Sequence, residues 1–371
     1  MAIELALKKP FAEAVDFFRG KVNMPTARWD DLWKDQHARA FMIAGATKAD
    51  LLADFRAAVD KAISEGTTLE TFRKDFDRIV AKHGWSYNGG RNWRSSVIYR
   101  TNIRTAYSAG RWQQMTDPDL LKLRPYLLYR HGDSAQPRPM HLSWDGTVLP
   151  ADHPWWDTHY TPNGWGCQCK VFSVGQRDLD RMGLDGPTAA PPIEIDPKTG
   201  APFGIDKGWD YNVGKAAEKG WAPLMQKFET LAPDLGRKLM TETLQGPAFE
   251  RFYNEKLPGN FPVAVLRPED KVALGSQAQT VLLSQESLKA HLIAHPEIGL
   301  EDYRKIPEIL DLGEVYKSGN ERLIYLQDGD RLYRAAIKRT SDGLENYFLT
   351  LFETAAARAS RQVRDKYERI R

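Results

Sequence analysis

The chain has 371 residues, of which 42% are hydrophobic and 27% charged, and its formal net charge is +3. This length exceeds what one hydrophobic core usually supports, so we expect two domains. The nearly balanced charge excludes a general electrostatic coating of nucleic acid and leaves only local basic surfaces for such a role. No apolar run approaches the ~18–20 residues that span a membrane, and no signal-peptide pattern is visible, so we expect synthesis in the cytoplasm.

The N-terminal third carries apolar residues at helical spacing, separated by residues that begin or end helices. Thr68 is a good N-cap, whereas Gly66 and Gly84 are typical of helix ends. The Met24-Pro25 pair is expected to interrupt the first helix. The pattern predicts helices over residues 10–44, 47–66, 68–84 and 91–115.

The last of these helices bears a stripe of basic residues. At ~100° per residue, Arg100, Arg104, Tyr107 and Arg111 fall within about 60° of one another. One interpretation is a solvated helix face. The other is an electropositive face for a carboxylate partner, a neighbouring subunit or a phosphate backbone.

Unusual residues are concentrated in segment 130–171, which contains both cysteines and four of the eight histidines. It is rich in Pro, Gly and Asp, so we expect loops and short strands, flanked by strands over 125–130 and 171–174. Cys167 and Cys169 are too close in sequence for a relaxed disulfide.

Thiolate and imidazole ligands together suit Zn²⁺. His141, Cys167 and Cys169 supply three candidate metal ligands. A fourth would come from Asp133, His131, His153 or His159. The alternative is that the cysteines are small buried apolar residues and that His141 is a hydrogen-bonded core histidine. A catalytic cysteine is disfavoured, because no third orienting group stands at a clear spacing.

Residues 184–210 lack periodicity and are rich in Pro and Gly, which is typical of a linker or extended arm. A short helix over 177–182 precedes them. Helices are expected over 215–255, and Pro258-Gly259 should mark the boundary to a last domain.

The C-terminal region alternates helical and strand patterns, and Asp328-Gly329 is a strong hairpin signal. Ser284 is a good N-cap for a helix that Pro296 ends. We expect strands over 280–283, 321–327, 331–339 and 345–352, and helices over 285–295, 303–310 and from 353 onward. Helices followed by a small antiparallel sheet form an α+β pattern.

Three side-chain types in this region suit chemistry on RNA. His291 and His295 lie four residues apart on one helix face, Lys338 lies on a strand, and Thr350 lies on the last strand. A histidine that moves a proton, a cation that stabilises a phosphorane and a hydroxyl suffice for metal-independent cleavage. The alternatives are that the two histidines are surface residues or bind a metal.

Several motifs of segment 130–171 occur together in a known family. They are Asp133, the Arg-Pro-x-His of 138–141, Asp145-Gly146, Pro154-Trp155 and the closing Pro-x-Gly-Trp-x-Cys-x-Cys. This combination resembles the head-morphogenesis family of tailed phages typified by the phage Mu F-like protein, over residues ~10–215. The resemblance implies a minor capsid protein of the virion, made in the host cytoplasm, with major capsid or portal proteins and packaged DNA as partners. It also implies a structural, buried role for Arg100.

The segment Lys-x-His-x-x-x-His-Pro-Glu of 289–297 and the strands after it resemble phage nuclease domains of the barnase–EndoU–colicin–RelE type. That resemblance covers residues ~260–371. It implies that His291 is the general acid/base, Lys338 the phosphate stabiliser and Thr350 an active-site hydroxyl, acting on RNA without a metal.

We therefore predict an α+β protein. Its expected parts are a helical domain with a loop-rich Cys/His subdomain over 1–183, an arm with connecting helices over 184–258, and a nuclease-like α+β domain with an antiparallel meander over 259–371. Two functional hypotheses follow. The first is a minor head protein that acts in capsid assembly through protein contacts. The second is a packaged or delivered ribonuclease whose N-terminal part targets it to the virion.

Overall fold

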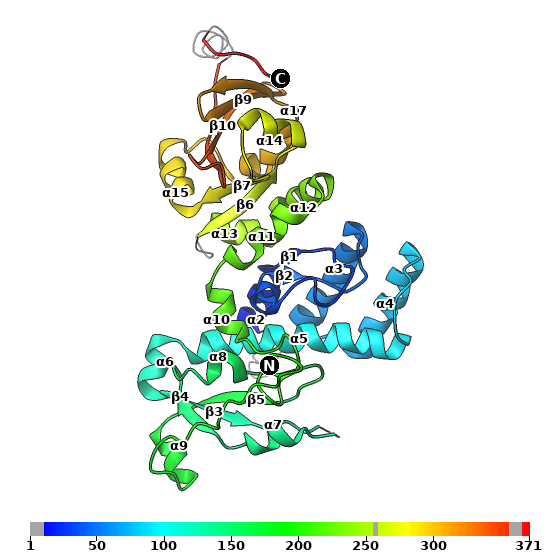
Figure 1. The fold of residues 1–371 in the computed structure, drawn as a ribbon, viewed down its shortest axis with the longest axis vertical. Helices are drawn as coiled ribbons and strands as arrows, with labels where there is room; N and C mark the ends of the chain where they lie inside the picture. Colours follow the sequence, from blue (N-terminus) through cyan, green and yellow to red (C-terminus); the bar gives the residue numbers. More distant parts are fainter. Residues whose placement is uncertain (1–10, 135, 255–258, 356–365) are drawn as a thin grey trace, which may run out of the picture. The chain divides into compact units, whose positions relative to one another are not determined.

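The computed structural model describes residues 11–134, 136–254, 259–355 and 366–371. The chain forms two compact units, one ending at Lys219 and the other beginning at Gly220 (Figure 1). Both units mix helices and strands, which confirms the α+β prediction. The division falls inside the segment expected to be an arm with connecting helices. None of the helices in the described part of the chain combines the length and apolar composition that crossing a bilayer requires.

The first unit is built around one long helix. Its helices are α2 (Ala12–Arg19), α3 (Ala49–Glu65), α4 (Leu69–His83), α5 (Arg91–Met115), α6 (Pro118–Leu123) and α10 (Val213–Glu218). Helices α2, α3, α4 and α10 all contact α5. A Cβ atom at Gly110 would lie 2.8 Å from the backbone nitrogen of Ala14, so glycine allows α2 to approach α5 closely. The predicted helices over 47–66, 68–84 and 91–115 are confirmed.

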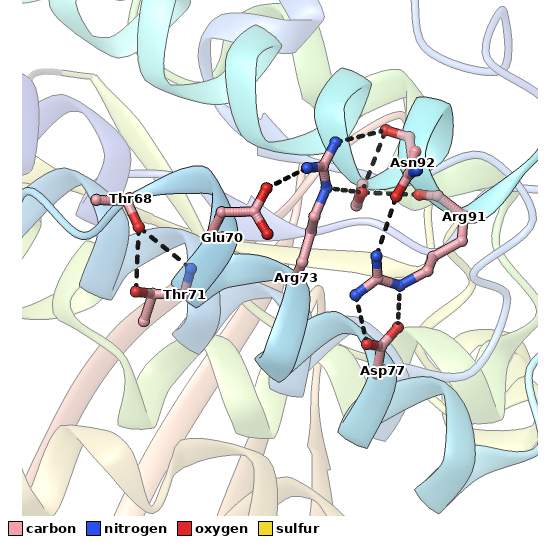
Figure 2. Close-up of polar contacts among 8 residues, drawn as sticks. Thr68, Glu70, Thr71, Arg73, Asp77, Arg91 and Asn92 are labelled. Atoms are coloured by element: carbon pink, nitrogen blue, oxygen red, sulfur yellow. Dashed lines mark hydrogen bonds and ion pairs between the residues drawn. The ribbon is translucent and has the colours of Figure 1, made fainter.

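Polar contacts join the first part of α4 to the start of α5 (Figure 2). Arg91 binds both carboxylate oxygens of Asp77, at 2.7 and 2.6 Å. Arg73 forms an ion pair with Glu70 and donates to the carbonyl of Asn92. These contacts are exposed and each contributes little free energy, but together they restrict the angle between the two helices.

The predicted helix over 10–44 is wrong beyond Arg19. Residues 20–44 instead contain β1 (Val22–Asn23), the 3₁₀-helix η1 (Lys34–Ala38) and β2 (Ala40–Phe41), and the two strands pair in parallel. Pro25 removes a backbone donor, and the Asp31 carboxylate accepts from the amides of Ala27 and Arg28. The apolar side chains of this segment therefore pack into the core from loops and short strands rather than from one face of a helix.

The lower part of the first unit in Figure 1 contains a three-stranded antiparallel sheet in the order β4-β3-β5. Its strands are β3 (Tyr126–Arg130), β4 (Val148–Pro150) and β5 (Lys170–Val174), and its short helices are α7 (Pro139–Ser143), α8 (Trp156–His159) and α9 (Gln176–Arg181). The predicted strands on both sides of the Cys-x-Cys motif are confirmed. Segment 184–210 contains no named helix or strand, but Ile205 and Trp209 return to the core.

The second unit contains a six-stranded sheet in the order β6-β7-β11-β10-β9-β8. Its strands are β6 (Asn260–Val265), β7 (Thr280–Ser284), β8 (Glu314–Ser318), β9 (Glu321–Asp328), β10 (Arg331–Arg339) and β11 (Asn346–Glu353). The meander from β8 to β11 is antiparallel, whereas β11 pairs with β7 in parallel. The predicted meander is confirmed. Strands β6 and β8 were not predicted; β6 contains Pro262 and lies at the edge of the sheet, where proline is tolerated.

The helices of the second unit are α11 (Ala222–Thr230), α12 (Pro233–Gln245), α13 (Pro247–Tyr253), α14 (Pro268–Leu274), α15 (Gln285–Ala294), α16 (Leu300–Arg304) and α17 (Ile306–Leu312). Ser284 caps α15 as predicted, by accepting from the amide of Ser287 at 3.0 Å. The helix predicted over 303–310 is divided in two just before Pro307. The helix predicted from residue 353 falls largely on 356–365, outside the described residues; Glu353 itself ends β11.

Candidate functional site

His141, Cys167 and Cys169 come together in the first unit, and we call them the Cys/His cluster. Helix α7 carries His141, and the loop from α8 to β5 carries both cysteines. Arg138 fixes the start of α7, because its guanidinium binds both carboxylate oxygens of Asp206 at 3.0 and 2.9 Å. The Cys/His cluster therefore forms where α7 meets the loop that precedes β5.

The geometry of the Cys/His cluster suits a metal ion. The Nδ1 atom of His141 lies 3.8 Å from the sulfur of Cys167 and 3.5 Å from the sulfur of Cys169. The three ligand atoms lie within 4.8 Å of one another. His141 is only 2% exposed, and its Nε2 atom lies 2.8 Å from the carbonyl oxygen of Gly204. Nε2 must donate to that carbonyl, so the lone pair of Nδ1 points at the two sulfurs.

The surroundings of the two sulfurs favour one thiolate. A hydrogen bond from Cys167 lowers the pKa of Cys169 against the opposing effect of burial, and the backbone of Gly132 lowers it further. The same hydrogen bond, together with burial, raises the pKa of Cys167, which keeps its proton. The thiolate form is therefore favoured at Cys169 rather than at Cys167. Binding of a metal would release the remaining thiol proton.

A close backbone approach shapes this cluster. A Cβ atom at Gly132 would lie 2.0 Å from the carbonyl oxygen of Gln168, the residue between the two cysteines. Any other residue at position 132 would displace that loop. The loop that contains Gly132 therefore depends on glycine to reach Cys169.

The predicted basic stripe on α5 is divided among three environments. The Nη1 atom of Arg104 donates to the carbonyls of Gly166 and Cys167, at 2.7 and 2.8 Å, and burial lowers its pKa. Arg111 lies over the ring of Phe172, 5.6 Å from its centroid. Arg100 is exposed, so the buried role expected for it is wrong. Arg104 is accordingly a positioning residue for the loop that carries the cysteines.

None of the four residues considered as a fourth ligand belongs to the cluster of candidate ligands in the described part of the chain. His159 is buried and stacks on Trp155, with ring centroids 4.3 Å apart, and burial lowers its pKa to about 4. His153 accepts from the backbone nitrogen of Trp155 at 3.1 Å. Neither His131 nor Asp133 joins the group. The described residues therefore supply three ligands, as in metal sites with one position left for water or another group.

Sequence reasoning missed the residues that orient the ligands. Gly204 and Asp206 belong to segment 184–210, which was expected to be an arm. Tyr129 donates to the side-chain oxygen of Asn163 at 3.0 Å and contacts Cys169. No spacing in the sequence links these residues to the Cys-x-Cys motif, because only the fold brings them together.

In the second unit the structure places His291 and Thr350 in contact, with Nε2 3.2 Å from Oγ1. The Nε2 atom also accepts from the backbone nitrogen of Leu351 at 3.0 Å, and Nδ1 lies 2.6 Å from the hydroxyl of Tyr303. The Nδ1 atom therefore carries the ring proton. Burial, and then the neighbouring His295, lower the pKa of His291 to about 4. These contacts favour a neutral histidine in a fixed orientation.

Lys338 lies apart from this histidine network. It pairs in register with Tyr347 and Glu321, and its Nζ atom lies 4.0 Å from the Glu321 carboxylate. Across the described residues, no hydrogen bond or ion pair joins Lys338 to His291 or Thr350. Arg334 instead lies over the ring of Phe352, on which His295 stacks.

Comparisons with known proteins identify relatives of this chain. A family model described as "Phage Mu protein F like protein" matches residues 53–172, which include α4, α5 and the Cys/His cluster. The chain is 32% identical over 274 residues to the "Putative capsid assembly protein F" of Escherichia phage Mu, covering 64% of this chain and 62% of that protein. It is 31% identical over 255 residues to the "Mu-like prophage FluMu F protein" of Haemophilus influenzae, covering 59% of each.

The chain thus spans about three fifths of the length of these curated relatives. The matches support the resemblance stated for residues ~10–215. The description of the phage Mu relative names capsid assembly, and neither description mentions a nuclease or zinc. No solved structure gives a significant match.

Proposed function

We propose that this protein is a minor head protein of a tailed phage or prophage, which acts in capsid assembly through contacts with major capsid or portal proteins. The observation that carries the proposal is the match of residues 53–172 to the Mu F-like family, together with the name of the phage Mu relative. We expect the protein to be part of the virion. The contacts of the first unit, rather than catalysis, would perform this role.

The Cys/His cluster would stabilise the part of the first unit that makes these contacts. Two thiolates and one imidazole suit Zn²⁺, and we propose that His141, Cys167 and Cys169 hold this ion. The hydrogen bond from His141 to Gly204 supports the assignment, because it orients the ring toward the sulfurs. A bound zinc ion would crosslink α7 to the loop before β5. Its contribution would be to folding stability.

Deleting the gene from the genome that encodes it tests the assembly role. Without the protein, we expect aberrant or missing heads in electron micrographs, and supplying the wild-type gene in trans should restore them. In restored particles the protein should co-purify with heads through a density gradient. Normal filled heads in the deletion strain would contradict the proposal.

A metal-independent ribonuclease in residues 259–371 is a second proposal. The observation that favours it is the contact between His291 and Thr350 on adjacent elements, with Arg334 nearby. The full-length chain would be incubated with RNA beside a His291→Ala variant, with Lys289→Ala as a matched control from the same helix. The proposal requires cleavage by the wild type and the control and loss of cleavage in His291→Ala. Absence of cleavage, or equal cleavage by all three, would overturn it.

A further inference from the structure

The first unit contains a cavity of about 670 Å³ that neither the Cys/His cluster nor the predicted sites use. Aromatic side chains form much of its lining. Trp29, Trp33, Trp165 and Trp209 form a continuous series in which neighbouring ring centroids lie 5.1 to 6.3 Å apart. Trp93 also lines the cavity and is 57% exposed. Large aromatic side chains gathered at an open cavity are typical of a surface that binds a partner.

The charged residues that line this cavity are all basic. The described residues that line it include Lys21, Arg28, Arg94 and Lys207 but no aspartate or glutamate. Arg28 forms an ion pair with Asp30 at 2.9 Å, and the same carboxylate interacts with Lys207. Two of the four cations therefore already have a carboxylate nearby.

Of the four cations Lys21 is the buried one, and among the described residues neither Lys21 nor the half-buried Arg94 forms an ion pair. Lys21 is 5% exposed, and its ammonium donates to the carbonyl oxygen of His37 at 2.6 Å. Its charged neighbours are Arg39 and Arg56, and burial, followed by these two cations, lowers its pKa to about 7. A buried ammonium without an anion is costly, so the free energy of the chain would fall if a carboxylate entered the cavity.

We propose that this aromatic cavity binds a peptide segment of a partner protein in which a carboxylate stands next to apolar or aromatic side chains, with the carboxylate on Lys21. The tryptophans would contact the apolar side chains of the segment. The inference rests on the proposed function in one respect: it assumes that the protein acts through protein contacts. It adds where one such contact is made and which chemistry recognises the partner.

Single-stranded nucleic acid is the rival occupant, because bases also stack on tryptophan. A phosphate backbone, however, needs a row of exposed cations without carboxylates between them. Here the Asp30 carboxylate interacts with both Arg28 and Lys207. Arg94 donates to the carbonyl of Ala44 and lies over the ring of Trp85, and Lys21 is buried. One buried ammonium fits one carboxylate better than it fits a phosphate chain.

A displayed library of short random peptides, selected on the full-length protein, tests the proposal. We expect enriched sequences to place Asp or Glu beside Trp, Phe or Leu. Lys21→Met should weaken the best peptide at least about 30-fold, the cost of removing one partner of a buried charge pair. Trp93→Ala should weaken it more than about 5-fold. Lys122→Met is the matched control, because that lysine is exposed on α6 and does not line the cavity.

Thermal unfolding shows whether the Lys21→Met variant is folded, so that weaker peptide binding can be assigned to the lost ammonium group. Lys21→Met removes a buried charge without an acidic partner and should unfold at the same or a higher temperature than the wild type. Enriched peptides without acidic residues, no enrichment, or equal binding to the wild type and Lys21→Met would overturn the inference. Displacement of the peptide by oligothymidylate would assign the cavity to nucleic acid and overturn it as well.

The two proposals fail separately. Acidic peptides that bind as expected, together with normal heads in the deletion strain, would leave the peptide site in place and remove the assembly role. If head formation requires the protein but the library yields no enriched acidic peptides, the assembly role would stand and the peptide site would be removed.

Discussion

His141 and His291 are buried imidazoles, one in each unit, and each has both ring nitrogens engaged. In His141 one nitrogen donates to a carbonyl and the other faces two sulfurs. In His291 one nitrogen faces the Tyr303 hydroxyl and the other accepts from the backbone nitrogen of Leu351. The two rings differ in the partner of the ring lone pair. In His141 the lone pair on Nδ1 is available to a metal ion, whereas in His291 the lone pair on Nε2 accepts a hydrogen bond from the backbone.

This comparison separates two roles that the sequence presents alike. A histidine beside cysteines and a histidine beside a threonine both suggest chemistry. Burial and the position of the ring proton decide which kind of chemistry each supports. The first suits a metal site, whereas the second must give up a backbone hydrogen bond before its Nε2 atom can take a proton.

Removing a ligand of the Cys/His cluster should have the largest effect. Cys169→Ser is expected to abolish stoichiometric zinc and to lower the unfolding temperature of the first unit sharply, because metal binding adds directly to folding free energy. Elemental analysis and calorimetry measure the two effects. His131→Gln is the matched control and should retain the metal. Wild-type protein purified without chelator that holds no stoichiometric zinc would contradict the metal assignment.

Acid should destabilise the second unit through His291. Its folded pKa of about 4 lies below the ordinary 6.5, so its contribution is fully present above pH 6.5 and is lost as pH falls toward 4. The full difference amounts to about 3 kcal/mol, of which about 2 should be lost between pH 7 and 5. Hydrogen exchange at the Leu351 amide reports it.

His291→Asn is the non-titrating comparison and should show a shallower pH dependence at that amide. If the variant and the wild type lose protection in parallel, His291 is not held neutral. The contrast with His141 would then disappear.

Arg104 should have an intermediate effect on the Cys/His cluster. Arg104→Met keeps the apolar stem but removes both hydrogen bonds to the carbonyls of Gly166 and Cys167. Because the ligands remain, zinc should still bind, but about 10- to 100-fold more weakly. Competition with a chromophoric chelator measures the change, and Arg100→Met on the exposed part of α5 should leave affinity unchanged. Equal affinities for the two variants would remove the positioning role.

Lys338 should have the smallest effect. The ion pair that its exposed side chain forms among the described residues is with Glu321, at 4.0 Å, so Lys338→Met should change the stability of the second unit by less than about 0.5 kcal/mol. Urea unfolding measures it, and the pH dependence at Leu351 should remain as in the wild type. A shifted pH profile in this variant would connect Lys338 to the His291 network.

Local signals in the sequence predicted much of the fold. The side chain of Thr68 caps α4 by accepting from the amide of Thr71, and Gly84 ends that helix in a left-handed conformation. Ser284 begins α15, and the turn after Asp328 joins β9 to β10. These elements were predictable because caps and turns depend on residues a few positions apart.

The failures lie where distant segments replace local preferences. Residues 29–41 have helical spacing, yet Val22 and Met24 pair with the backbone of Arg39 and Phe41. Segment 184–210 has no periodicity, yet it supplies Gly204 and Asp206 to the cluster. The cavity beside Lys21 was not predicted at all, because its lining comes from stretches up to about 190 residues apart.

By itself, the sequence determined which donors are present: two thiols one residue apart, a histidine after Arg-Pro, and a second histidine on a capped helix. Donor identity is a covalent property, so it can be read without a fold. Only the tertiary structure decided which lone pair stays open, which proton is held and which lysine is buried without an acidic partner. Those properties depend on burial and on hydrogen bonds between segments far apart in the chain.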